Sequence, residues 1–173
     1  MPASAPLEHF EIAAIFDAPR ELVWKAWTMP EYMSKWFGPK GFKGKAHKLD
    51  FRPGGIYHYS LTSPDGKEMW GKFVYREIEP MKKIVFVNSF SDAEGGLTRH
   101  PMNPNWPAEM LSTITFEESG SGTKVTVQWS PIDPSEAERQ TFVENTASMQ
   151  QGWTGTFDQL ADYLVEAKKG QAA

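Results

Sequence analysis

The stretch that decides the fold lies near the C-terminus and reads Asp133-PSEAERQTFVENTASMQQGWTGTFDQLADYLVEAK-Lys169. Its larger, mostly apolar side chains recur at steps of three and four residues, so on a helix they share one side. These positions are Phe142, Thr146, Met149, Trp153, Phe157, Leu160 and Leu164. The pattern predicts one long amphipathic helix, and such a helix needs a large apolar surface to lie against.

The ends of this helix are also marked. Asp133 can cap the N-terminus, and so can Ser135, with Glu138 as its capping-box partner. Gly170 can take the left-handed conformation that ends a helix. A straight helix over the whole stretch would be about 54 Å long, against roughly 40 Å for a compact domain of this size. We therefore expect a bend at residues 152–155, where two glycines lie, or a later start.

Upstream, the pattern predicts one strand, two short helices and an antiparallel meander. Residues 9–16 alternate as a half-buried strand does, and two short helical patterns follow, separated at Met29-Pro30. Turns rich in Gly and Pro join most of the later strands. Those strands are expected at residues 45–51, 56–61, 69–79, 84–90, 110–116 and 123–129. The fold class is therefore α+β, with a seven-stranded antiparallel sheet.

Short motifs along the chain match a known pattern in order and spacing. They are Pro19-Arg20-Glu21-Leu22-Val23-Trp24-Lys25-Ala26-Trp27, Trp36-Phe37-Gly38-Pro39, Asp50-Phe51-Arg52-Pro53-Gly54-Gly55, Pro64-Asp65-Gly66, Gly122-Thr123-Lys124-Val125 and Gly152-Trp153. Over residues 8–167 the chain resembles the activator of heat-shock protein 90 ATPase homologue family, within the START-like, or SRPBCC, superfamily. The resemblance implies the helix-grip fold, in which a curved sheet wraps the C-terminal helix and leaves a cavity between them.

The domain organisation follows from the same resemblance. One START-like domain accounts for residues 8–169, and we expect flexible termini at 1–7 and 170–173. Eukaryotic chaperone activators carry a separate N-terminal domain, for which this chain has no room. The resemblance therefore implies a stand-alone binding or catalytic role rather than chaperone contact, and it leaves a homodimer open. The N-terminus lacks the apolar run of a signal peptide or membrane span, so we expect a cytoplasmic protein.

Composition excludes several classes of function. The chain has 173 residues with 18 basic and 22 acidic side chains, and a net charge of -4 gives no reason to expect nucleic acid as a partner. Cysteine is absent, which excludes disulfides and thiolate chemistry. The sequence has no phosphate-binding loop, dinucleotide fingerprint or nucleophile elbow, so we expect no cofactor.

Histidines and carboxylates give no convincing catalytic or metal site. With a tight hairpin at residues 52–55, Leu49 lies opposite His58, and His47 becomes a diagonal neighbour of His58, ~7 Å away. A metal site needs a third ligand, and none is evident there, so we expect no metal. Asp50 and Arg52 could pair on the surface. The sequence therefore identifies no candidate catalytic residue.

Aromatic side chains are the feature of the sequence that favours a ligand-binding site. Alternating positions on several strands, with the inner face of the helix, would surround a ring-lined space with a few hydroxyls and one amide. The candidate ligand-binding residues are Trp153, Met149, Phe157, Tyr57, Tyr59, Phe73, Tyr75, Phe86, Asn88, Phe90, Ser112 and Ile114. Gly152 and Gly155 flank Trp153 and its neighbour, and they either let the helix approach a strand or leave room for a bound molecule.

Residues 91–109 form the exception to the regular pattern, because they are rich in Pro and Gly and have no period. Loops of this length are commonly disordered or act as lids. Trp106 and Met102 favour a loop that packs over something.

Three functions remain open. The first is a binder of a small apolar or aromatic molecule in the cavity. The second is an enzyme of the same fold acting on a polyketide-like or ester substrate, with Tyr57, Tyr59 or Asn88 polarising it. The third is an interaction module that contacts a chaperone or another protein.

Overall fold

A computed structural model describes residues 9–38, 41–98 and 103–172. The N-terminal residues 1–7, expected to be flexible, lie outside the described residues. The chain begins with a strand and two short helices, β1 (Phe10–Phe16), α1 (Arg20–Thr28) and α2 (Pro30–Trp36). The remaining strands are β2 (Lys43–Leu49), β3 (Ile56–Thr62), β4 (Glu68–Glu79), β5 (Lys83–Ser91), β6 (Leu97–Thr98), β7 (Met110–Ser119) and β8 (Gly122–Pro131). Two helices end the chain, α3 (Glu136–Glu144) and α4 (Thr146–Ala172).

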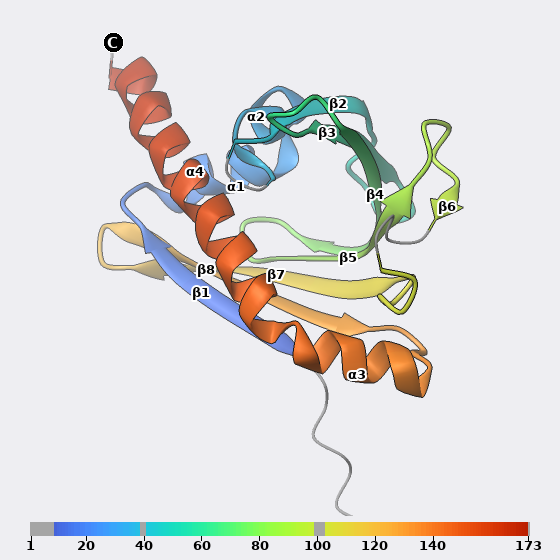
Figure 1. Ribbon diagram of the computed structural model, residues 1–173. Coiled ribbons are helices and arrows are strands. Elements are labelled where there is room, and N and C mark those ends of the chain that lie inside the picture. The colour runs from blue at the N-terminus through green and yellow to red at the C-terminus, as the bar shows by residue number, and fades with distance from the viewer. Residues whose placement is uncertain (1–8, 39–40, 99–102, 173) are drawn as a thin grey trace, which may run out of the picture.

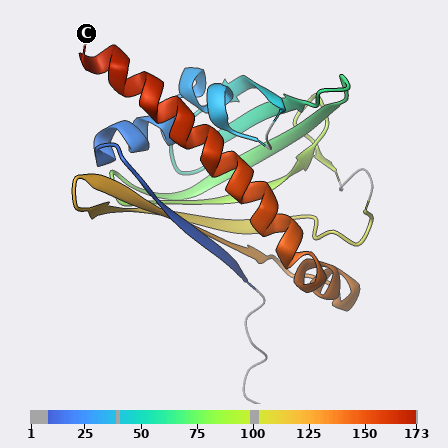
Figure 2. The ribbon, with the colours of Figure 1, turned by 60° about the vertical axis from the view of Figure 1, so that its left-hand side comes forward.

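The strands form one antiparallel sheet, and the predicted fold class is confirmed. Seven strands pair in the order β1-β8-β7-β5-β4-β3-β2, and the short β6 pairs with β5. The sheet curls so strongly that β2 and β3 lie across from β1 and β8, with α4 lying along the open side of the curve (Figure 1). A second view shows α4 crossing the sheet diagonally from α3 toward the end where α1 and α2 lie (Figure 2).

The C-terminal helical stretch is divided, and the long helix α4 has the later start that was the second of the two expectations, at Thr146. The break falls at Asn145, whose φ of -101° and ψ of 15° are not helical. Its side-chain amide donates to the Thr141 carbonyl, 2.8 Å away, and the Thr146 hydroxyl donates to the Val143 carbonyl at the same distance. Polar side chains that bond to nearby backbone carbonyls in this way compete with helix continuation. The glycines at 152 and 155 stay inside α4.

The structure shows which of the predicted capping residues end the C-terminal helical stretch. Ser135 is the N-cap, because its Oγ accepts from the Glu138 amide at 3.1 Å and Glu138 Oε1 accepts from the Ser135 amide at 2.9 Å. Asp133 instead lies before the helix with a positive φ of 43°. At the other end α4 continues through Gly170 to Ala172, past the predicted glycine stop.

The core lies on the concave side of the sheet, under α1, α2 and α4. The inner side of α1 is buried, with Leu22, Val23, Ala26 and Trp27 in the core. The Trp27 ring meets Trp36 edge to face at 4.8 Å and stacks on Trp153 at 6.1 Å. These contacts tie both short helices to α4.

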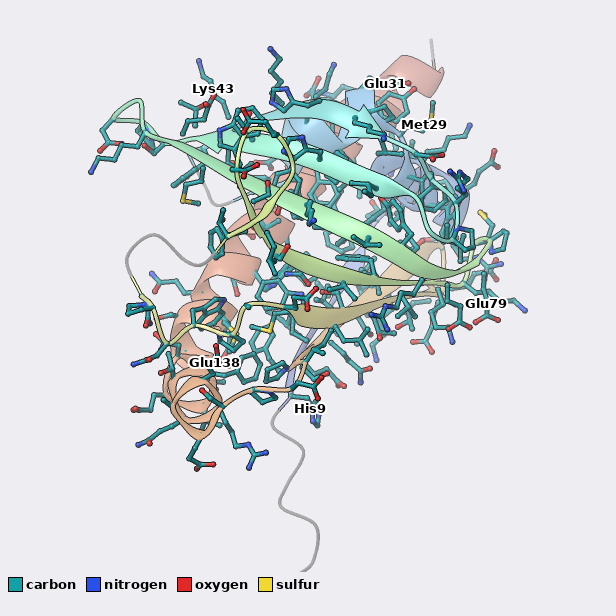
Figure 3. The ribbon with its side chains drawn as sticks, turned by 90° about the vertical axis from the view of Figure 1, so that its right-hand side faces the viewer. His9, Met29, Glu31, Lys43, Glu79 and Glu138 are labelled. Carbon is teal, nitrogen blue, oxygen red and sulfur yellow. The ribbon has the colours of Figure 1, made fainter. Side chains whose placement is uncertain are left out.

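The outer face of the sheet carries the polar side chains of the alternating strands. Figure 3 looks onto this face, with Lys43 and Glu79 toward opposite ends of the strands. Among the described residues, no helix has both the length and the apolar character needed to cross a lipid bilayer.

Candidate functional site

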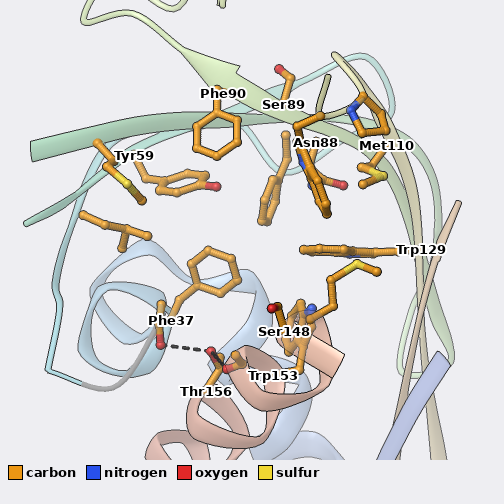
Figure 4. A pocket seen from close by; sticks show the side chains of 18 of the residues that line it. Phe37, Tyr59, Asn88, Ser89, Phe90, Met110, Trp129, Ser148, Trp153 and Thr156 are labelled. Atoms are coloured by element: carbon orange, nitrogen blue, oxygen red, sulfur yellow. Dashed lines mark hydrogen bonds between the residues drawn. The ribbon is translucent and has the colours of Figure 1, made fainter. Parts of the chain in front are cut away.

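A cavity of about 400 Å³ lies between α4 and the concave face of the sheet. Its walls come from three parts of the chain (Figure 4). The sheet provides a wall of rings with one amide, made by Tyr59, Phe73, Phe86, Asn88, Phe90 and Trp129. The helix α4 provides Met149, Gly152, Trp153 and Thr156. The connection after α2 closes one remaining side with Phe37 and Gly38, and the connection before β7 closes another with Asn103, Trp106 and Pro107.

The structure separates the predicted ligand-binding residues into two groups. The cavity is lined by Trp153, Met149, Tyr59, Phe73, Phe86, Asn88 and Phe90. The residues Tyr57, Tyr75, Ser112, Ile114 and Phe157 do not line it. That the first group binds a ligand stays a prediction.

The second group lies on the predicted face but inside the filled part of the core. Tyr57 and Tyr75 are 1% and 2% exposed, and Ile114 is fully buried. The Phe157 ring packs edge to face on Phe16 of β1 at 5.4 Å. Alternation along a strand identifies the face that a side chain occupies, but not how far along that face the core is filled.

Several lining residues were not among those predicted. Trp129 meets Trp153 at 5.6 Å, and Phe37 meets Trp153 at 6.3 Å, so both close the space around that indole. Phe37 belongs to the motif at residues 36–39, and Trp129 shares a strand face with Val125 and Val127. Those two signals could have found them.

Gly152 opens the helix wall of the cavity. A Cβ placed on Gly152 would meet no other group within 4 Å. Of the two roles considered for this glycine, leaving room beside Trp153 therefore fits, and close approach to a strand does not. Thr156, one turn later, has its Oγ1 at 3.0 Å from both the Gly152 and the Gly38 carbonyl oxygens (Figure 4). This hydroxyl joins α4 to the connection after α2.

Gly71 gives room for Tyr59 on the sheet wall. The two residues are paired across β3 and β4, and the Tyr59 ring lies over Gly71. A Cβ at Gly71 would lie 2.6 Å from Tyr59 Cζ, a distance that real side chains do not tolerate. The glycine therefore lets the phenol extend across β4, and Figure 4 shows its hydroxyl pointing into the cavity. Burial raises the pKa of Tyr59 above its ordinary value, so the phenol stays neutral.

Asn88 is oriented by a buried neighbour. The hydroxyl of Ser112, which is fully buried, donates to Asn88 Oδ1. This bond orients the carboxamide, and its N–H groups can donate to other partners. Ser112 thus contributes to the site without lining the cavity.

The cavity wall carries rings, thioethers, amides and hydroxyls, with little charge. Among the described lining residues there is no Asp, Glu, Lys, Arg or His. Tyr59 is the titratable side chain in this group. The wall can therefore exclude water and offer directed hydrogen bonds, while the described part of it holds no carboxylate or imidazole for general acid–base chemistry.

His47 and His58 come together on the outer face of the sheet. The predicted register, with Leu49 opposite His58, is wrong, because an irregularity between Ala46 and Lys48 places Lys48 opposite His58. The two imidazole centroids lie 5.8 Å apart, and the Trp70 ring packs on both. In the described part of the chain, no three His, Asp or Glu side chains gather where they could hold a metal ion.

Both imidazoles already have partners on this face. His47 Nε2 lies 2.8 Å from Ser60 Oγ, and His58 Nε2 lies 3.1 Å from the Asp92 carbonyl oxygen. Burial, followed by the charges of Lys45 and His58, lowers the pKa of His47. The predicted pair of Asp50 and Arg52 is also present, with Arg52 Nε at 2.8 Å from Asp50 Oδ2 on the surface.

The segment at 91–109 is partly ordered against the site. It is not wholly irregular as expected, because β6 pairs with β5 after a turn closed by Asp92 and Gly96. Trp106 and Pro107 line the cavity, and the Trp106 ring packs on Phe142 of α3 at 6.0 Å. The expected contribution of Met102 lies outside the described residues.

Comparison with known proteins places this geometry in a family. The model of the family described as Activator of Hsp90 ATPase homolog 1-like protein matches residues 17–165. No curated protein matches the chain with significant similarity.

Solved structures share the fold at low sequence identity. Protein Ms6760 from Mycobacterium smegmatis is 23% identical with a TM-score of 0.74, and 91% of each chain is covered. A protein from Arthrobacter aurescens is 24% identical with a TM-score of 0.78, covering 92% of this chain and 87% of that one. Protein NE0264 from Nitrosomonas europaea is 24% identical with a TM-score of 0.74, covering 96% of this chain and 99% of that one. At such identities the likeness concerns the fold.

Proposed function

Because this chain belongs to the family of Activator of Hsp90 ATPase homolog 1-like proteins, we propose that it binds one small apolar or aromatic molecule between the sheet and α4. The observation that carries the proposal is the open space at Gly152. A glycine in the middle of a helix costs about 1 kcal/mol relative to alanine, and here no neighbouring group requires it. The space beside Trp153 accounts for its presence.

The size and lining of the cavity support the same role. A volume of about 400 Å³ falls within the range of small-molecule sites, roughly 300–1,000 Å³. Rings from sheet, helix and connections surround it, with centroid distances such as 5.6 Å between Trp129 and Trp153. Removing apolar ligand surface from water contributes roughly 25 cal/mol per Å² to the free energy of binding. Rigid aromatic side chains lose little conformational entropy when they contact a ligand.

The enzyme alternative has less support in the described wall of the cavity. Acid–base chemistry on an ester or polyketide needs a group that can exchange a proton near neutral pH. Tyr59 is the titratable group in the described part of the lining, and burial moves its pKa further from neutrality. Binding without chemistry is therefore the function that the geometry favours.

The test fills the space beside Trp153 with one substitution and compares that variant with a matched variant at an exposed neighbouring position of α4. Gly152→Leu puts a large side chain into the cavity, whereas Gln151→Leu adds the same side chain at an exposed neighbouring position. Melting temperature and tryptophan fluorescence are measured with a panel of apolar and aromatic compounds. Compounds that stabilise the natural sequence should stabilise Gln151→Leu equally and leave Gly152→Leu unaffected.

Native mass spectrometry of freshly purified protein adds a direct readout, in which a co-purified molecule is present with Gln151→Leu and absent with Gly152→Leu. Two results contradict the proposal. One is a panel in which no compound shifts the melting temperature, with no co-purified molecule. The other is ligand binding that persists unchanged in folded Gly152→Leu protein.

A further inference from the structure

The cavity that is proposed to bind a ligand also restricts the charge of that ligand. The part of its wall that the structure describes has no charged side chain. A carboxylate or ammonium group entering this space would lose its hydration without gaining a counter-ion, which is unfavourable. The described wall therefore favours an uncharged molecule.

The first directional group in the cavity is the Tyr59 hydroxyl. The ring is held between Tyr57, stacked at 5.0 Å, and Phe37, edge to face at 5.4 Å, and it lies over Gly71. The hydroxyl at the end of this ring points into the cavity (Figure 4). Because burial raises the pKa of this phenol, its proton stays on the oxygen and the group can donate.

The second directional group is the Asn88 carboxamide. Ser112 donates to its oxygen and so orients the carboxamide, whose two N–H bonds can donate to a ligand. Along β4, Tyr59 pairs with Gly71 and Asn88 pairs with Phe73, so the two donors occupy neighbouring rows of the same sheet face. Thr156 offers no competing donor, because its hydroxyl faces the carbonyls of Gly38 and Gly152.

We infer that the cavity selects an uncharged, ring-bearing molecule with an acceptor oxygen, such as an aromatic ketone, whose carbonyl accepts from Tyr59 and Asn88. The inference rests on the proposed function and adds the chemical class of the ligand. The rings of the wall hold the ligand ring, and the two donors discriminate among molecules of the same shape.

Three probes of nearly identical shape test this selection. Methyl naphthyl ketone carries the acceptor, isopropenylnaphthalene replaces the carbonyl oxygen by a methylene group, and naphthoate replaces the acetyl group by a carboxylate. Titration calorimetry at neutral pH should find the ketone bound about five- to tenfold more tightly than the hydrocarbon, the effect of one or two net hydrogen bonds. Naphthoate should show no measurable binding.

Two variants and one control variant show which side chains cause the preference for the ketone. Tyr59→Phe keeps the ring and removes the donor, so the ratio of ketone to hydrocarbon affinity should fall toward one while the hydrocarbon affinity is retained. Tyr57→Phe makes the same change on the same strand at a residue outside the cavity, and it should leave the ratio unchanged. Asn88→Leu should lower the ratio as well, with circular dichroism verifying the fold of each variant.

The outcomes separate this inference from the proposed function. Equal affinity for ketone and hydrocarbon, or binding of naphthoate as tight as that of the ketone, overturns the inference and leaves an apolar binder standing. Failure of all three probes also overturns the ligand class, while the Gly152→Leu comparison still tests the cavity. If Tyr59→Phe fails to fold, the probe series on the natural sequence decides the question alone.

Discussion

Trp27 lies where α1, α2 and α4 meet, and its burial makes its loss costly. It is 2% exposed and contacts the rings of Trp36 and Trp153. Trp27→Ala should lower the free energy of unfolding by ~3–5 kcal/mol, the range for large buried aromatic side chains. Urea unfolding measures this, with Ile15→Ala, at a residue 65% exposed, as a control that changes stability by less than ~0.5 kcal/mol. A loss below about 1 kcal/mol for Trp27→Ala would contradict the packing described.

Tyr75 carries a polar atom that the core does not use. Its hydroxyl is buried and has no hydrogen-bond partner among the described residues. Leaving such a group unpaired costs ~1–3 kcal/mol, so Tyr75→Phe should raise the free energy of unfolding by about 1 kcal/mol or more. The ring keeps its edge-to-face contact with Phe51 at 5.0 Å. Urea unfolding again provides the measurement, and a destabilised variant would mean that the hydroxyl has a partner after all.

At the scale of elements, two glycines should respond oppositely to the same change. Gly152→Ala should stabilise α4 by about 0.5–1 kcal/mol, because alanine favours the helix and its Cβ meets no other group within 4 Å. Gly71→Ala should destabilise β4, because its Cβ would lie 2.6 Å from Tyr59 Cζ. Thermal and urea unfolding of both variants would show the difference in sign. If Gly152→Ala also destabilises, α4 is packed at that position and the cavity does not reach it.

At the scale of the whole molecule, ligand binding should connect the segment before β7 to the cavity. Trp106 and Pro107 line the cavity while Trp106 packs on α3, so a ligand that contacts them should hold residues 103–109 in place. Amide hydrogen exchange in this segment should slow at saturating ligand. At a hundred times its dissociation constant the ligand should also stabilise the fold by ~2.7 kcal/mol through mass action. Unchanged exchange at 103–109, with the stability gain present, would mean that this segment does not cover the ligand.

Much of the fold follows from local patterns in the chain. The spacing of apolar residues from Phe142 to Leu164 predicts the long helix and its buried side, and period-two alternation predicts the strands and their inner faces. Both signals are short-range, because they reflect how each residue projects from its own element. The ring-rich face of the candidate site was therefore predictable, including Tyr59, Phe73 and Trp153.

How far the cavity extends along the sheet face does not follow from these short-range signals. Tyr57 and Tyr59 share a strand face and a residue type, yet one lies in the filled core and the other lines the cavity. The open space beside Tyr59 is bordered by residues that are distant along the chain, such as Phe37 and Gly152. The break at Asn145 has a local cause, because Asn145 and Thr146 bond to nearby backbone carbonyls. Periodicity locates a face, and the packing of distant segments leaves part of that face open.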